Sequence, residues 1–224
     1  MYDYEITGGP AFAEVRVNLK AGEVLKAEGG AMSHMDGEVG METKSGGLFS
    51  GLKRSLTGES FFQNMFTGPG SVTLAPMMPG EIIPLEISPD QGWVIQQDAY
   101  LAGSPNIDVS SKWGGFRSIL GGEGSFLTHL SSNDGDKGQV FLGGFGSLKK
   151  HDIPAGKEYV IDTGIFFATP DSTNFHTSKV GGMKSFFFGG EGLVMRFSGP
   201  CTIYTQSRGI HSFLDLILSK VPAR

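Results

Sequence analysis

The sequence predicts an all-β fold built from three copies of one unit, with a short amphipathic helix at the C-terminal end. The first observation behind this prediction is a Gly-Gly motif that occurs three times, each time with a Gly-Glu pair shortly after it. The second is the composition, because 35 Gly and 11 Pro supply turns while 39% hydrophobic residues can form a core. The third is that a clear helical periodicity stands out only near the C-terminal end.

The Gly-Gly motif recurs at a nearly constant spacing. From Gly47 to Gly115 is 68 residues, and from Gly115 to Gly182 is 67 residues. A fixed period of this length marks a repeated structural unit. We therefore expect the three copies to share one architecture.

Each copy contains turn and strand signals in the same order. The unit begins with a Pro or Gly turn and an apolar run, at 19–25, 78–83 and 153–160. After the Gly-Gly motif, a Gly-Glu turn leads into a second run, at 58–62, 122–127 and 190–195. A third run, rich in β-branched and aromatic residues, follows a Gly-containing turn at 68–74, 136–142 and 199–204. These runs predict a sheet-forming unit.

The units follow one another without a linker. We expect them at about 17–76, 77–151 and 152–206, within a single domain that covers residues 1–224. A chain of this length can bury about 70% of its unfolded surface, so it needs no metal or disulfide to hold its core. The sequence thus predicts one pseudo-symmetric body.

The last segment, 209–221, reads as an amphipathic helix. Apolar residues recur there at spacings of three and four, and Pro222 ends the pattern. An isolated helix of this length is marginal in water, so we expect its apolar stripe to dock on the β body or on a partner subunit. Leu216 falls off that stripe, which leaves a partner-binding or membrane-surface role open.

The net charge and the cysteine content limit the compartments and the classes of partner that we expect for this protein. The formal net charge is −5, which argues against a nucleic-acid partner, since such proteins usually present a basic face. Cys201 is the only cysteine, so no intrachain disulfide can form, as is usual in a reducing compartment. The N-terminal segment lacks the features of a signal or import peptide. We therefore expect a soluble cytoplasmic protein.

A search for catalytic and ligand-binding motifs gives no candidate for an active site. The five histidines are scattered and show no metal-ligand spacing. The Gly-rich segments do not complete a phosphate-binding loop, and no nucleophile elbow occurs. We expect no catalytic residue, no metal site and no cofactor.

The triplicated Gly-Gly loop is the remaining candidate for a functional site. Each copy places an aromatic residue close to a cation, and we expect the copies to meet at one end of the molecule. The apolar side chains then either plug that end of the β body or form an exposed apolar crown ringed by cations, which would mark an interaction surface. The interaction residues of this hypothesis are Phe49, Lys53, Phe116, Arg117, Lys184 and Phe186.

The motifs as a set resemble a known family. The segment 68–76, the turn Pro79-Gly80-Glu81, the three Gly-Gly units and the segment 205–208 before the terminal helix are similar to the mitochondrial biogenesis Aim family, the twenty-fourth of its series. The resemblance covers nearly the whole chain. It implies a fold like that of the tryptophan RNA-binding attenuator protein, TRAP: a stack of three β-repeats about a pseudo-three-fold axis. It implies no known enzyme activity, and a shared fold does not carry a function.

Two functions follow as hypotheses. The first is a non-enzymatic scaffold or interaction protein that forms a homo-oligomer and engages protein or peripheral membrane partners through its loops or its helix. The alternative is a small-molecule-binding protein or enzyme with an axial pocket between the repeats, at which Glu59, Glu123 and Glu191 converge. A closed pocket with convergent polar groups would favour the alternative.

Overall fold

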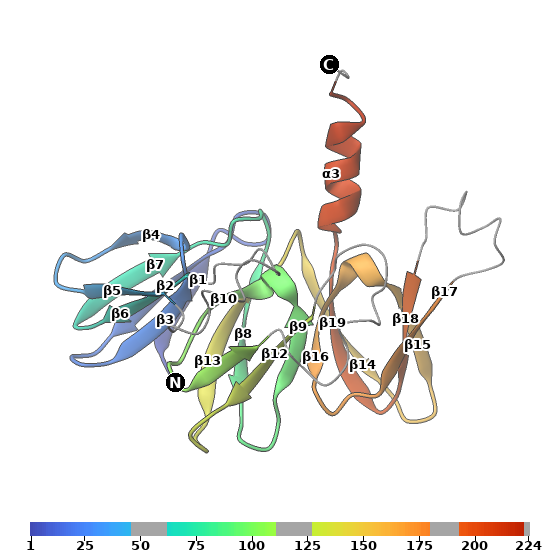
Figure 1. Cartoon of the computed structure of the whole chain (residues 1–224), viewed down its shortest axis with the longest axis horizontal. Helices are drawn as coiled ribbons and strands as arrows, with labels where there is room; N and C mark the ends of the chain where they lie inside the picture. Colours follow the sequence, from blue (N-terminus) through green and yellow to red (C-terminus); the bar gives the residue numbers. More distant parts are fainter. Residues whose placement is uncertain (46–61, 111–126, 180–192, 222–224) are drawn as a thin grey trace.

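The protein is built almost entirely of antiparallel strands. The structure, a computed structural model, describes residues 1–45, 62–110, 127–179 and 193–221. Within these ranges the chain forms a row of twisted sheets, with one α-helix at its C-terminal end (Figure 1). The predicted all-β class with a terminal helix is confirmed.

The strands fall into three groups of six, preceded by β1 (Asp3–Thr7) and followed by helix α3 (Ile210–Leu218). The first repeat contains β2 (Glu14–Leu19), β3 (Val24–Glu28), β4 (Met32–Met35), β5 (Gly40–Ser45), β6 (Phe62–Thr67) and β7 (Gly70–Leu74). The second contains β8 (Ile82–Ile87), β9 (Trp93–Gln96), η1 (Gln97–Ala99), β10 (Tyr100–Gly103), β11 (Ile107–Ser110), β12 (Leu127–Ser132) and β13 (Gly138–Gly143). The third contains β14 (Leu148–Ile153), β15 (Glu158–Asp162), η3 (Thr163–Ile165), β16 (Phe166–Pro170), β17 (Phe175–Lys179), β18 (Leu193–Ser198) and β19 (Cys201–Gln206).

The same four strand pairings occur in every repeat. In the first repeat β2 and β4 both pair with β7, while β3 and β5 both pair with β6. The second and third repeats reproduce this pattern strand for strand. Even the bulge in the third strand of each repeat recurs, at Met32/His34, Tyr100/Ala102 and Phe166/Ala168. The repeated pattern begins with β2, β8 and β14, so the boundaries expected at 17 and 152 fall inside strands.

Successive repeats are joined edge to edge. Strand β10 of the second repeat pairs with β3 of the first, with Ala102 opposite Ala27. Strand β16 of the third repeat pairs with β9 of the second, with Ala168 opposite Ile95. Each junction therefore merges half of one repeat with half of the next into a six-stranded sheet.

Four sheets result, and the three repeats that share them lie in a row along the long axis of the molecule (Figure 1). We number them sheet 1 (β1-β2-β7-β4), sheet 2 (β5-β6-β3-β10-β13-β8), sheet 3 (β11-β12-β9-β16-β19-β14) and sheet 4 (β15-β18-β17). Strands β4 and β15 occupy the positions that a further junction would use, but they lie at opposite ends of the row and do not pair with each other. The described strands thus form an open stack of three repeats.

Three apolar cores fill the spaces between neighbouring sheets. Val17 and Phe66 belong to the core between sheets 1 and 2. Ile95 and Val140 belong to the core between sheets 2 and 3, and Phe197 to the core between sheets 3 and 4. Every one of these side chains is essentially inaccessible to solvent. Each core also contains side chains from a neighbouring repeat, namely Phe141 in the first, Phe167 in the second and Val94 in the third, so no repeat completes a core by itself.

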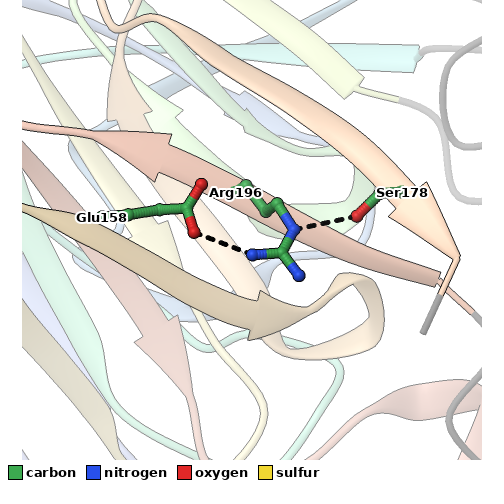
Figure 2. Close-up of polar contacts among 3 residues, drawn as sticks. All are labelled: Glu158, Ser178 and Arg196. Atoms are coloured by element: carbon green, nitrogen blue, oxygen red, sulfur yellow. Dashed lines mark hydrogen bonds and ion pairs between the residues drawn. The ribbon is translucent and has the colours of Figure 1, made fainter. Parts of the chain in front are cut away.

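The outer face of sheet 4 is polar, unlike the faces between the sheets. Figure 2 shows Arg196 on β18 between its two partners on the neighbouring strands: its Nη1 donates to the Glu158 carboxylate at 2.8 Å and its Nε to the Ser178 hydroxyl at 3.1 Å. At the other end, the Arg16 Nη2 donates to the Ser71 hydroxyl at 3.1 Å. Both ends of the stack therefore present hydrogen-bonded polar groups to water, as terminal units of repeat proteins do.

The connections between repeats form a ladder of their own. The amide of Ala13 donates to the carbonyl of Gly80, and the amide of Glu81 donates to the carbonyl of Gly146. The amide of Ser207 donates in turn to the carbonyl of Ser147. The segments that enter and leave the repeats are thus held side by side, and the close approach of these backbones requires glycine at position 80.

Replacing Gly80 with Ala is expected to destabilise the protein by about 1–2 kcal/mol. A Cβ atom at this position would lie 2.1 Å from the carbonyl oxygen of Gly144 and 2.6 Å from the amide nitrogen of Gly146, and neither backbone atom can turn aside. Urea denaturation would measure the loss. Gly37→Ala is the control, because a Cβ there meets no atom within 4 Å; equal stability of the two variants would contradict the prediction.

Candidate functional site

The interaction residues expected from the sequence, Phe49, Lys53, Phe116, Arg117, Lys184 and Phe186, lie outside the described residues, as do Glu59, Glu123 and Glu191. The strands on either side of the three Gly-Gly loops are described. Strand β5 pairs with β6, β11 with β12 and β17 with β18, so each loop is carried by an equivalent antiparallel hairpin. The crown of aromatic residues and cations itself stays a prediction.

A cavity lies where the connections of the three repeats come together. Its volume is about 360 Å³. The first repeat contributes the end of β3, the second contributes η1 and the start of β10, and the third contributes the end of β19 and the start of α3. Its apolar wall is made mostly by Met77, Met78, Leu101, Phe145 and Ile210. This cavity between the repeats is the best formed candidate site in the described part of the chain.

Two carboxyl groups from different repeats line the cavity. Glu28 is the last residue of β3, and Asp98 lies in η1. Burial raises the pKa of Glu28 to about 7, and the neighbouring Asp98 carboxylate adds to this effect. Among the described residues, neither carboxylate has a hydrogen-bonded or ion-paired partner, and the cavity lining contains no Lys, Arg or His.

Amide groups hold the rest of the polar lining in place. The Gln206 Nε2 donates to the Gln96 Oε1 at 2.7 Å, and the Gln206 Oε1 accepts a hydrogen bond from the amide of Phe145 at 3.0 Å. The Tyr100 hydroxyl donates to the carbonyl of Lys26 at 3.2 Å, and burial raises the pKa of this phenol. Gln96 and Gln206 are thus fixed by each other and by the backbone, whereas the carboxylates of Glu28 and Asp98 remain open to a ligand.

The cavity combines two carboxyl groups and fixed amide groups with an apolar wall, an arrangement that can bind a small molecule. Within the described residues, no serine or cysteine side chain lines the cavity. The described residues also contain no group of three or more His, Cys, Asp and Glu side chains placed to hold a metal ion. Glu28 and Asp98 are not among the site residues expected from the sequence, because nothing in the local sequence shows that residues from two repeats share a cavity.

Residues of the motifs that resemble the family form hydrogen bonds between the segments that connect the repeats, next to this cavity. Glu81, from the Pro79-Gly80-Glu81 turn, accepts a hydrogen bond from the amide of Leu148 through its Oε2 at 2.5 Å. Ser207, which follows Gln206, accepts one from the amide of Ser147 through its hydroxyl at 2.9 Å. These motif residues therefore hold the repeats in register, and their role in the structure is architectural.

Helix α3 stands away from the β body (Figure 1). Of the two expected docking sites for its apolar stripe, the β body does not cover the helix, since Leu214, Ile217 and Leu218 are 45%, 44% and 65% exposed; docking on a partner subunit stays a prediction. Its first turn does touch the body, since Ile210 lines the cavity and the ring of Phe213 meets that of Phe145 edge-on at 5.1 Å. The helix leaves the end of β19 and continues outward, so its later turns reach no sheet. Within the described residues, no helix has the length and apolarity to cross a membrane.

Comparisons with known proteins agree on the fold and leave the activity open. The family model described as "Mitochondrial biogenesis AIM24" matches residues 4–208. An uncharacterized protein of Streptococcus pyogenes serotype M6 is 28% identical over 223 residues, which cover 94% of this chain and 88% of that protein. A crystal structure of a protein from Streptococcus pyogenes superposes with a TM-score of 0.77 at 24% identity, covering 99% of this chain and 100% of that one.

Proposed function

The chain belongs to the mitochondrial biogenesis AIM24 family. The matched streptococcal relative is uncharacterized, so the function has to be inferred from the structure itself. We propose that the protein is a non-enzymatic interaction protein that self-associates through helix α3. The observation that carries this proposal is the exposed apolar surface of α3. Exposed clusters of large apolar residues usually mark interfaces. Among the described residues, no sheet covers the later turns of the helix, and a second copy of the chain would supply an apolar surface of matching chemistry.

The charge of the helix favours a protein surface over an anionic membrane. Segment 210–221 contains one basic residue, Lys220, and one acidic residue, Asp215. Helices that lie on membranes usually carry several Lys or Arg on their polar face, and α3 lacks them. The polar outer faces of sheets 1 and 4 also make α3 the main apolar surface available for self-association among the described residues.

Replacing Leu214 with Asp is expected to reduce the mass measured by light scattering to that of one chain. The charge would lie in the helix contact, where an unpaired carboxylate is costly. The melting temperature of the separated chain should change little, because Leu214 is 45% exposed within one chain. Ser212→Asp is the matched control, since it adds the same charge to an exposed position of the same helix that is already polar.

The proposal fails if the wild-type protein has the mass of one chain at all concentrations, or if Leu214→Asp keeps the wild-type mass. A second experiment measures the binding of the wild type and of Leu214→Asp to vesicles of anionic lipid. A single-chain mass together with wild-type vesicle binding that Leu214→Asp abolishes would assign α3 to a membrane surface instead.

A further inference from the structure

Self-association through α3 gives no role to the two carboxyl groups that line the cavity between the repeats, those of Glu28 and Asp98. We propose that this cavity binds a small organic cation, in which an ammonium group carries an apolar body. The ammonium would sit between the carboxylates of Glu28 and Asp98, and the apolar body would lie against the apolar wall that includes Met77 and Ile210.

The size and lining of the cavity fit a small molecule. Its volume of about 360 Å³ is within the usual range of about 300–1,000 Å³ for ligand pockets. Met77, Met78 and Phe145 supply a soft, adaptable apolar surface. Met77 is 95% exposed, so a bound apolar group would cover a side chain that the folded chain leaves in water. The wall therefore favours a ligand with a hydrocarbon part over a hydrated inorganic ion.

The charge of the cavity selects the sign of the ligand. Lys26 precedes Glu28 by two residues on β3, but it is buried, and its Nζ donates to the carbonyl of Ile107. Within the described ranges, the other titratable groups that act on Glu28 are Asp98 from η1 and Tyr100 from β10, which are acidic or neutral. A ligand cation would thus pair with carboxylates that no described cation neutralises, whereas an anion would be repelled.

Calorimetric titration with hexylammonium, hexanol and hexanoate tests the proposal, because the three probes share an apolar chain and differ in their charge. We expect hexylammonium to bind at least about tenfold more tightly than hexanol at pH 8, and hexanoate not to bind. Glu28→Gln should weaken hexylammonium binding about tenfold and leave hexanol binding within about twofold. Glu42→Gln, at an exposed position of β5, is the control and should match the wild type.

The dependence on pH gives a second readout. Glu28 must be ionised to hold the cation, and its pKa in the free protein is about 7. From pH 8 to pH 6 the affinity for hexylammonium should fall about tenfold in the wild type and stay nearly constant in Glu28→Gln. Equal binding of hexylammonium and hexanol, no binding of hexylammonium, or unchanged binding by Glu28→Gln would each overturn the proposal. Each outcome is independent of the mass measurements on α3.

Discussion

Replacing Phe141 with Ala is expected to lower the free energy of unfolding by about 3–5 kcal/mol. Phe141 lies on β13, which pairs with β8 and β10 inside sheet 2, and its side chain is fully buried. Its ring meets the ring of Tyr4 edge-on at 5.0 Å and lies 6.4 Å from that of Tyr2. The substitution would therefore leave a cavity in the core between sheets 1 and 2 and remove aromatic contacts.

Urea denaturation would measure this loss, with Phe12→Ala as the matched control. Phe12 is 75% exposed, so removing its ring should change stability by less than about 0.5 kcal/mol. Phe141 belongs to the second repeat, whereas Tyr2 and Tyr4 precede the first. Because the contact joins two repeats, the substitution also tests whether the repeats unfold in one cooperative transition. A loss below about 1 kcal/mol, or an added transition in the unfolding curve, would show that this core does not couple them.

The class of the fold and the existence of three copies could be predicted from the sequence, because both depend on local signals. Turns rich in Gly and Pro and the runs between them mark strands wherever they occur, and a copy can be recognised by comparison with another copy. The helix at 209–221 was predictable for the same reason, and the structure forms it over Ile210–Leu218. Its environment was not, because periodicity shows which face is apolar but does not show what covers that face.

The junctions between repeats could not be predicted from the same signals. Strand β3 pairs with β6 of its own repeat and with β10 of the next, and nothing in its five residues distinguishes one neighbour from the other. This pairing brings Glu28, at the end of β3, to the cavity that Asp98 also lines. The candidate site thus depends on non-local strand pairing, which the sequence does not show. The Gly-Gly loops, in contrast, are recognisable in the sequence because they are repeated.

Replacing Glu28 with Gln is expected to stabilise the protein at pH 8 and to have little effect at pH 4. The pKa of Glu28 is raised from 4.5 to about 7 by folding, first by burial and then by Asp98. Below pH 4.5 the carboxyl is protonated in the folded and the unfolded chain, so the group imposes no penalty that depends on charge. Between pH 4.5 and 7 the unfolded chain releases the proton while the folded chain keeps it, and stability therefore falls as the pH rises. Above pH 7 the loss is complete.

A glutamine at position 28 never ionises, so the difference in stability between Glu28→Gln and the wild type should grow between pH 4.5 and 7 and then level off at about 2 kcal/mol, allowing for partial solvent screening. The amide should fit, because Gln96 ends β9 as Glu28 ends β3 and lines the same cavity. Thermal unfolding at a series of pH values would measure the difference, and Glu42→Gln, which removes an exposed carboxylate, should show no such growth. A difference that is independent of pH would mean that Glu28 is ionised without cost in the folded chain, and the carboxylate would then have a partner or free access to water.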